Sequence, residues 1–149
     1  MAEKRPRGVC CHEAGHAVVA HSYRLRVQMV RVAFSEAKGW HGGTDLPLGS
    51  PDHLDVVDQL AIWTAGKDAE DVLKCPAHET AWFDDLGQIA AVLSRKGIPE
   101  DQHWPLITEA RERARAILMA SIETALSLTE RLVECGRVER DEFLRLIQE

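Results

Sequence analysis

The segment His12-Glu13-Ala14-Gly15-His16 constrains this chain more than any other feature. Residues four apart lie on one face of a helix, so His12 and His16 can present two imidazole nitrogens to one metal ion. Glu13 stands one step round the helix, where its carboxylate can reach a metal-bound water. This H-E-x-x-H pattern is typical of zinc hydrolases, in which two histidines bind the metal and the glutamate serves as a base.

Apolar residues flank the motif on both sides, with Val9-Cys10-Cys11 before it and Ala17-Val18-Val19-Ala20 after it. The pattern predicts a helix over residues 8–23 that is largely buried. Two imidazoles and a carboxylate are costly to bury unless they are paired or bound to a metal. The alternative is a surface helix with incidental histidines, and the apolar flanks argue against it.

The composition indicates one folded domain without a membrane span. A chain of 149 residues can bury a proper core, and 45% hydrophobic and 28% charged residues are ordinary for a globular protein. The net charge of −6 argues against a general nucleic-acid binder. No apolar run approaches the roughly 20 residues that cross a bilayer, and no signal-peptide pattern is present. We therefore expect a cytoplasmic protein.

The chain has four cysteines, and none of them forms a C-x-x-C pair: Cys10, Cys11, Cys75 and Cys135. Cys10 and Cys11 are neighbours, which is poor geometry for a mutual disulfide. We therefore expect all four to be reduced. A Cys75 thiolate as a zinc ligand is a less favoured alternative.

Hydrophobic periodicity predicts a mainly α fold with a small β element between the first two helices. β-Branched residues predict a strand over 27–34, and the glycines of 39–43 predict a turn or a flexible strand edge. Both segments are candidates for pairing with an extended substrate. Ser50-Pro51 predicts the start of a second helix that ends near residue 73, and a third helix is expected over 84–94.

The last third of the chain is the most regular part. Pro105 opens a predicted helix of about 30 residues, which Gly136 ends, and a short helix over 139–147 follows. Intramolecular packing of this long helix is favoured over a coiled-coil dimer, because about three heptads are short for a coiled coil. Its apolar seam steps by three and four residues: Ala114, Leu118, Ser121, Ala125, Leu128 and Leu132.

A catalytic zinc usually has three protein ligands and a water, so a third ligand is needed. Metzincins take it from a histidine soon after the motif, but the corresponding positions here are Val19 and Ser22. A more distant carboxylate must therefore serve. The candidates are Glu36, which we expect to be solvated, Glu70 inside the second helix, and Asp84 and Asp85 at the expected start of the third helix.

Three blocks of the sequence resemble the peptidase domain of FtsH-type ATP-dependent zinc metalloproteases. The first is Cys11-His12-Glu13-Ala14-Gly15-His16-Ala17, and the second is Ala65-Gly66-Lys67-Asp68-Ala69-Glu70-Asp71, which is similar to the family's Gly-Gly-Arg-x-Ala-Glu-Glu. The third, Thr80-Ala81-Trp82-Phe83-Asp84-Asp85-Leu86, falls where the family has Thr-Gly-Ala-x-x-Asp-Leu. The likeness covers residues 9–147, and it departs from the family where bulky Ala81-Trp82-Phe83 replaces the glycine and alanine.

The resemblance implies a helical zinc-peptidase domain over residues 1–149, with a metal-site core over about 8–96 and a C-terminal helical part over about 104–149. It assigns His12 and His16 as Zn²⁺ ligands, Glu13 as the catalytic base and Asp85 as the third ligand. Glu70 matches a family glutamate near the site. We expect it to orient a histidine, with the place of third ligand as the alternative.

The implied function is a metalloendopeptidase that cleaves unfolded or short polypeptides. The family carries an ATPase module and membrane helices ahead of its peptidase, whereas this motif begins at residue 12, and the sequence has no G-x-x-x-x-G-K-[ST] loop. An ATPase partner in trans would have to supply unfolding, and the family's rings suggest a homo-oligomer. The alternative function is a non-proteolytic regulatory or adaptor protein that keeps its zinc site. The aromatic residues Trp40, Trp82 and Phe83 are candidates for shaping a side-chain pocket.

Overall fold

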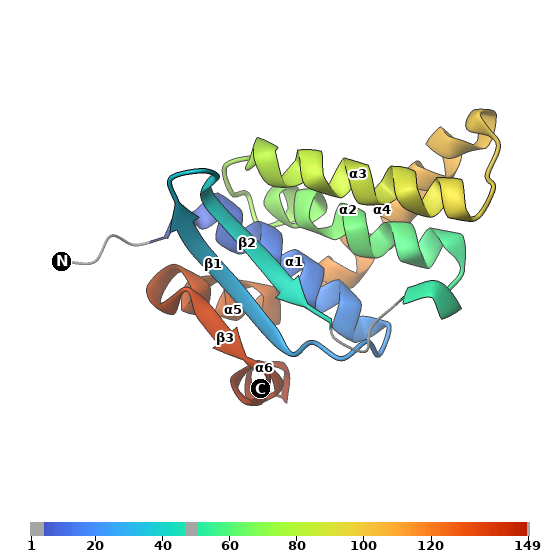
Figure 1. Ribbon diagram of the computed structural model, residues 1–149. Helices are drawn as coiled ribbons and strands as arrows, with labels where there is room; N and C mark the ends of the chain where they lie inside the picture. Colours follow the sequence, from blue (N-terminus) through green and yellow to red (C-terminus); the bar gives the residue numbers. More distant parts are fainter. Residues whose placement is uncertain (1–4, 47–50, 149) are drawn as a thin grey trace.

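The computed structural model describes residues 5–46 and 51–148 and has a mainly helical fold with a small antiparallel sheet (Figure 1). This confirms the predicted fold class in its coarse form. The elements follow in the order α1 (Arg7–Ser22), β1 (Met29–Ser35), β2 (Gly39–Asp45), η1 (Pro51–His53), α2 (Val56–Val72), α3 (Glu79–Arg95), η2 (Glu100–Gln102), α4 (His103–Ala120), α5 (Ile122–Cys135), β3 (Arg137–Glu139) and α6 (Arg140–Gln148).

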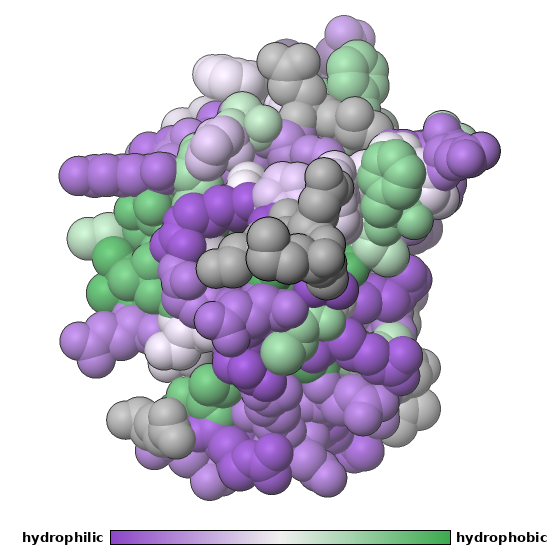
Figure 2. Space-filling view, turned by 90° about the vertical axis from the view of Figure 1, so that its left-hand side faces the viewer, coloured by the Kyte–Doolittle hydropathy of each residue, from purple (hydrophilic) through white to green (hydrophobic). Residues whose placement is uncertain are grey.

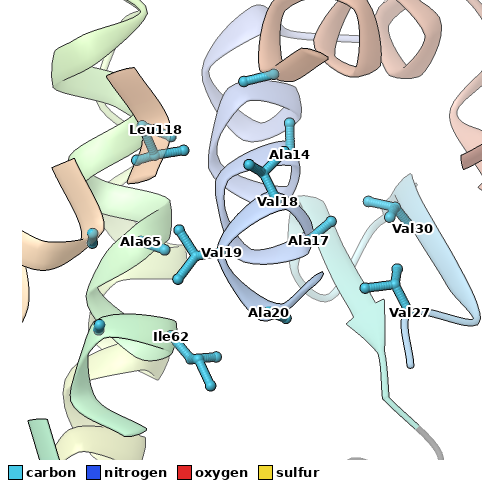
Figure 3. Close-up of a cluster of buried hydrophobic side chains, with 14 of the residues drawn as sticks. Ala14, Ala17, Val18, Val19, Ala20, Val27, Val30, Ile62, Ala65 and Leu118 are labelled. Atoms are coloured by element: carbon cyan, nitrogen blue, oxygen red, sulfur yellow. The ribbon is translucent and has the colours of Figure 1, made fainter. Parts of the chain in front are cut away.

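Helix α1 forms the centre of the molecule and is buried without a break from Gly8 to Ala20. Figure 3 shows Val19 on the side of α1 that faces α2 and Ala17 on the side that faces β1. Helix α2 approaches very closely, because a Cβ added at Gly15 would lie 2.5 Å from the carbonyl oxygen of Ala65. The motif therefore lies inside the core, as its apolar flanks predicted.

The sheet has the order β2-β1-β3, so β1 is central and β2 forms one edge. Val30 and Val32 of β1 are buried, whereas Arg31 between them is exposed, which is the alternation expected of a strand with one solvated face. The predicted strand and the glycine-rich segment together form this β1–β2 hairpin. The short strand β3 was not predicted, because three residues between Gly136 and a helix carry too little pattern.

The predicted 30-residue helix is wrong, because the chain leaves helical geometry at Ser121, which has φ −120° and ψ 29°. The break lets α4 pack on α2 and α5 pack on α1, two contacts that one straight helix cannot make. The seam is nevertheless buried inside the chain, as the favoured interpretation required. Its residues with no exposed surface are Ala114, Leu118, Ala125, Leu128 and Leu132.

Two other helix starts also differ from the sequence prediction. Helix α2 begins after Asp55, whose side chain accepts a hydrogen bond from the Asp58 amide at 2.8 Å, and the predicted cap Ser50 lies outside the described residues. Helix α3 begins at Glu79 instead of residue 84, because the aromatic residues before Asp84 continue the helix. Asp84 and Asp85 therefore lie within the helix and not at its N-terminus.

The expectation of four reduced cysteines is also wrong, since Cys11 and Cys75 form a disulfide. The loop after α2 folds back over the first turns of α1, where a Cβ added at Gly8 would lie 2.3 Å from the carbonyl oxygen of Pro76. That contact brings together two cysteines that are 64 residues apart. The disulfide also removes Cys75 as a thiolate ligand for zinc. Cys10 and Cys135 are free.

The face of the molecule shown in Figure 2 is largely hydrophilic, with hydrophobic residues scattered over it. Among the described residues, no helix is both long and apolar enough to span a membrane.

We predict that replacing Cys75 with serine lowers the free energy of unfolding by about 4 kcal/mol, because the disulfide closes a long loop and so restricts the unfolded chain. Urea unfolding without reductant measures this difference. Cys135→Ser, which changes an exposed free cysteine, is the control and should unfold like the original protein. An original protein whose unfolding is unaffected by a dithiol reductant would contradict the prediction.

Candidate metal centre

Three of the predicted site residues converge inside the molecule. His12 and His16 of α1 direct their Nε2 atoms at Oδ2 of Asp85 in α3, at 2.7 Å and 3.0 Å, and the two Nε2 atoms lie 3.1 Å apart. All three side chains are buried. Their potential ligand atoms lie within 4.8 Å of one another, so the cluster can hold a metal ion.

Each imidazole ring is also held through its Nδ1 atom, on the side of the ring away from Asp85. Nδ1 of His12 lies 3.1 Å from Oε1 of Glu70, and Nδ1 of His16 lies 2.8 Å from the carbonyl oxygen of Ile62. When each Nδ1 donates its proton to that oxygen, each Nε2 keeps a free lone pair toward the cluster. Glu70 therefore lies across the His12 ring from Asp85, a position that suits orientation of the ring better than metal ligation.

Glu70 is itself held by two further groups. The backbone N–H of His78 donates to its Oε1 at 3.0 Å, and Lys67 lies 3.6 Å from its Oε2. Helix α2 also makes room for the ring that Glu70 orients, because a Cβ added at Gly66 would lie 2.4 Å from Nε2 of His12. A glycine at this position is therefore required by the close approach of ring and helix.

Glu13 is covered by strand β2. The hydroxyl of Thr44 lies 3.2 Å from the backbone carbonyl oxygen of Glu13 and 3.3 Å from its Oε1, and it can donate its one proton to either. A Cβ added at Gly42 would lie 2.5 Å from Cγ of Glu13. Burial raises the pKa of Glu13 and outweighs the opposing effect of His16 and His12. A carboxyl group of this kind, beside the His12–His16–Asp85 cluster, is suited to accept a proton and return it.

The charges of His12, His16 and Asp85 stabilise one another. Burial alone would lower the pKa of His12, but its hydrogen bonds to Asp85 and Glu70 raise that pKa to about 9. The pKa of His16 is raised despite burial by the charge of Asp85, and the two histidines lower the pKa of Asp85 despite its burial. The two histidines and Asp85 therefore favour one another's charged forms.

The donor set fits a zinc ion. Two imidazole nitrogens and one carboxylate oxygen are ligands that Zn²⁺ takes at catalytic sites, with bonds of about 2.0–2.2 Å in a tetrahedral arrangement. Such bonds place the ligand atoms roughly 3.3 Å apart. The observed separations of 2.7–3.1 Å need to widen by about 0.2–0.6 Å to reach this spacing.

A cavity of about 250 Å³ opens beside the cluster, between β2, α2 and α3. Its apolar part includes Ile62 and Trp63, and the Trp63 ring lies 6.2 Å from the ring of His16. The predicted aromatic residues Trp40, Trp82 and Phe83 do not line it. The described lining consists of His12, Glu13, His16, His41, Gly42, Gly43, Thr44, Leu46, Ile62, Trp63, His78, Ala81, Asp84, Asp85 and Gln88.

Several lining residues were missed at the sequence level, Trp63 and His78 among them. Trp63 lies in a helix that periodicity marks only as amphipathic, and His78 lies outside any motif. His41 lies in the glycine-rich segment that was predicted to pair with a substrate, but no role was assigned to its side chain. Glycines on both sides of His41 were the only local signal that this segment passes close to another element. The remaining sequence candidate, Glu36, is exposed beyond the end of β1, as expected.

Comparison of the chain with protein-family models found no match, and comparison with curated proteins found none either. The likeness to FtsH-type peptidases therefore stays a prediction from the sequence blocks.

We predict that Gly66→Ala weakens zinc binding by about 10- to 100-fold, because the added methyl group displaces the His12 ring from the cluster. Titration with a competing zinc chelator measures the affinity. Gly87→Ala is the matched control, since a Cβ at Gly87 meets nothing within 4 Å. Equal zinc affinity in the two variants would show that the His12 ring is not confined as described.

Proposed function

We propose that this protein is a zinc-dependent metalloendopeptidase that hydrolyses unfolded or short polypeptides and needs no ATP as an isolated chain. The observation that supports this most directly is the convergence of His12, His16 and Asp85, with Glu13 buried beside them at the wall of one cavity. A metal cluster that served only to stabilise the fold would have no need for a carboxyl group at that position.

In the proposed reaction, His12, His16 and Asp85 hold the zinc ion. A bound zinc supplies an acidified water and a Lewis acid for the peptide carbonyl. Glu13 takes the proton of the attacking water and passes it to the leaving amine. The raised pKa of Glu13 suits both halves of this transfer, and Thr44 keeps the carboxyl group turned toward β2.

The outer edge of β2 is suited to bind an extended polypeptide. The amide of Val32 donates to Gly136 on the β3 side. The N–H and C=O groups of successive residues in a strand point to opposite sides, so the residues next to Val32 direct theirs toward β2. Gly42, the partner of Val32 in the β1–β2 register, then directs its own main-chain groups away from β1 and along the cavity wall. A substrate strand pairing there would pass directly over Glu13.

We predict that Glu13→Gln retains zinc but loses about 10²- to 10⁴-fold in the cleavage rate of casein, because only the proton transfer is removed. Release of dye-labelled fragments measures the rate, and metal analysis measures the zinc. Glu36→Gln, which changes an exposed carboxylate of the hairpin, is the control. Unchanged cleavage in Glu13→Gln would rule out Glu13 as the base. A zinc-loaded original protein without any cleavage would favour the regulatory or adaptor function.

The two carboxylates around His12 should differ in their effect on metal content. We predict that Asp85→Ala loses most of the zinc, since a ligand is removed, whereas Glu70→Ala keeps zinc with an affinity lowered by about 10- to 100-fold. Metal analysis after dialysis against a weak chelator separates the two outcomes. If Asp85→Ala kept its full zinc content and Glu70→Ala lost it, Glu70 would be the third ligand and Asp85 would not.

A further inference from the structure

The guanidinium group of Arg31 lies over β2 on the solvent-exposed face of the sheet, next to Gly43. Arg31 of β1 is the register partner of Gly43 in β2, and Gly43 lines the cavity. A Cβ added at Gly43 would lie 3.3 Å from Nη2 and 3.5 Å from Cζ of Arg31. The absence of a side chain at Gly43 therefore lets the guanidinium rest over β2, close to its outer edge.

Arg31 is an exposed cation without an ion-pair partner among the residues that the structure describes. Its register partner on the other side, in β3, is Arg137, which is already paired with Glu139 at 2.9 Å. Like charges on neighbouring strands repel each other when they lie directly opposite. A substrate carboxylate beside Gly43 would therefore relieve the repulsion between Arg31 and Arg137. Asp45 stands on the same face but forms no ion pair with Arg31.

We propose that Arg31 selects polypeptides that carry an acidic side chain near the cleaved bond. The proposal rests on the proposed function and on strand pairing along β2. Side chains of a paired strand alternate between two faces, so one set would enter the cavity and the other would lie on the outer face with Arg31. A residue of the paired strand opposite Gly43 would have its Cβ about 4.5–5.5 Å from the Cβ position of Gly43. From there a Glu or Asp carboxylate is within reach of the guanidinium group.

The opposite wall of the cavity makes this preference depend on position. Asp84 of α3 lines the cavity and is exposed, so an acidic side chain that lies against α3 at the cavity mouth meets a like charge. An acidic residue is therefore favoured at the outward-facing position beside Arg31 and disfavoured at an inward-facing position beside Asp84.

The test uses fluorescein-labelled unstructured peptides in which a single Glu, or a matched Gln, is moved through the positions that flank the cleaved bond. Anisotropy with the zinc-loaded protein measures binding whether or not the peptide is cut, and kcat/KM is measured for those that are cut. We expect Glu to be preferred over Gln about fivefold at one position in low salt, and less at high salt. Arg31→Gln should abolish the preference for Glu over Gln. With Arg31→Glu, a peptide that carries Lys at the same position should bind better than the Gln peptide.

Arg145→Gln is the matched control, because it removes an exposed arginine of α6, which packs on β3 at the side of the sheet away from β2. It should leave the Glu preference intact. A preference that survives in Arg31→Gln, or equal binding of Glu and Gln peptides at every position, overturns the proposal. Peptides that bind with the Arg31-dependent preference but are never cut would overturn the proposed peptidase function and leave Arg31 as a recognition residue.

Discussion

The fold depends on the burial of three polar side chains in its central helix. His12, Glu13 and His16 lie in the only stretch of α1 where neighbours on every side are also buried, so each of their polar atoms must find a partner inside the protein. Partners come from separate elements: Asp85 from α3, Glu70 from α2 and Thr44 from β2. The positions of these elements around α1 are therefore fixed by hydrogen bonding as well as by apolar packing.

Glycines make that arrangement sterically feasible. Gly15 admits α2 against α1, Gly66 admits the His12 ring against α2, and Gly42 admits β2 against Glu13. At each of these positions a methyl group would overlap an atom of the neighbouring element or side chain. This close packing buries the polar cluster, and electrostatic interactions are stronger in a buried site than in bulk water.

The local parts of this architecture were predictable, and the long-range parts were not. The spacing of His12 and His16 defines one helix face whatever surrounds it, and β-branched residues are enough to indicate β1. The choice between Asp85 and Glu70 depends on which side of the His12 ring each one reaches, a relation between three helices that no local pattern records. The break at Ser121 has the same origin, because packing on both α1 and α2 overrides a continuous helical repeat. The pairing of Cys11 with Cys75 arises likewise from the return of a distant loop.

The cluster that can hold a metal ion joins parts of the chain that are far apart in sequence, His12 and His16 on one side and Asp85 on the other. Helix α3 packs chiefly on α2, and Asp85 is its link to the histidines of α1. A metal ion bound here would link α3 to α1. Its binding would stabilise the native state by mass action, as any ligand does that binds only the folded protein. Metal supply would then set how firmly α3 is docked. Because weakly docked helices are sites of local opening, the lifetime of this protein in a cell would follow its metal content.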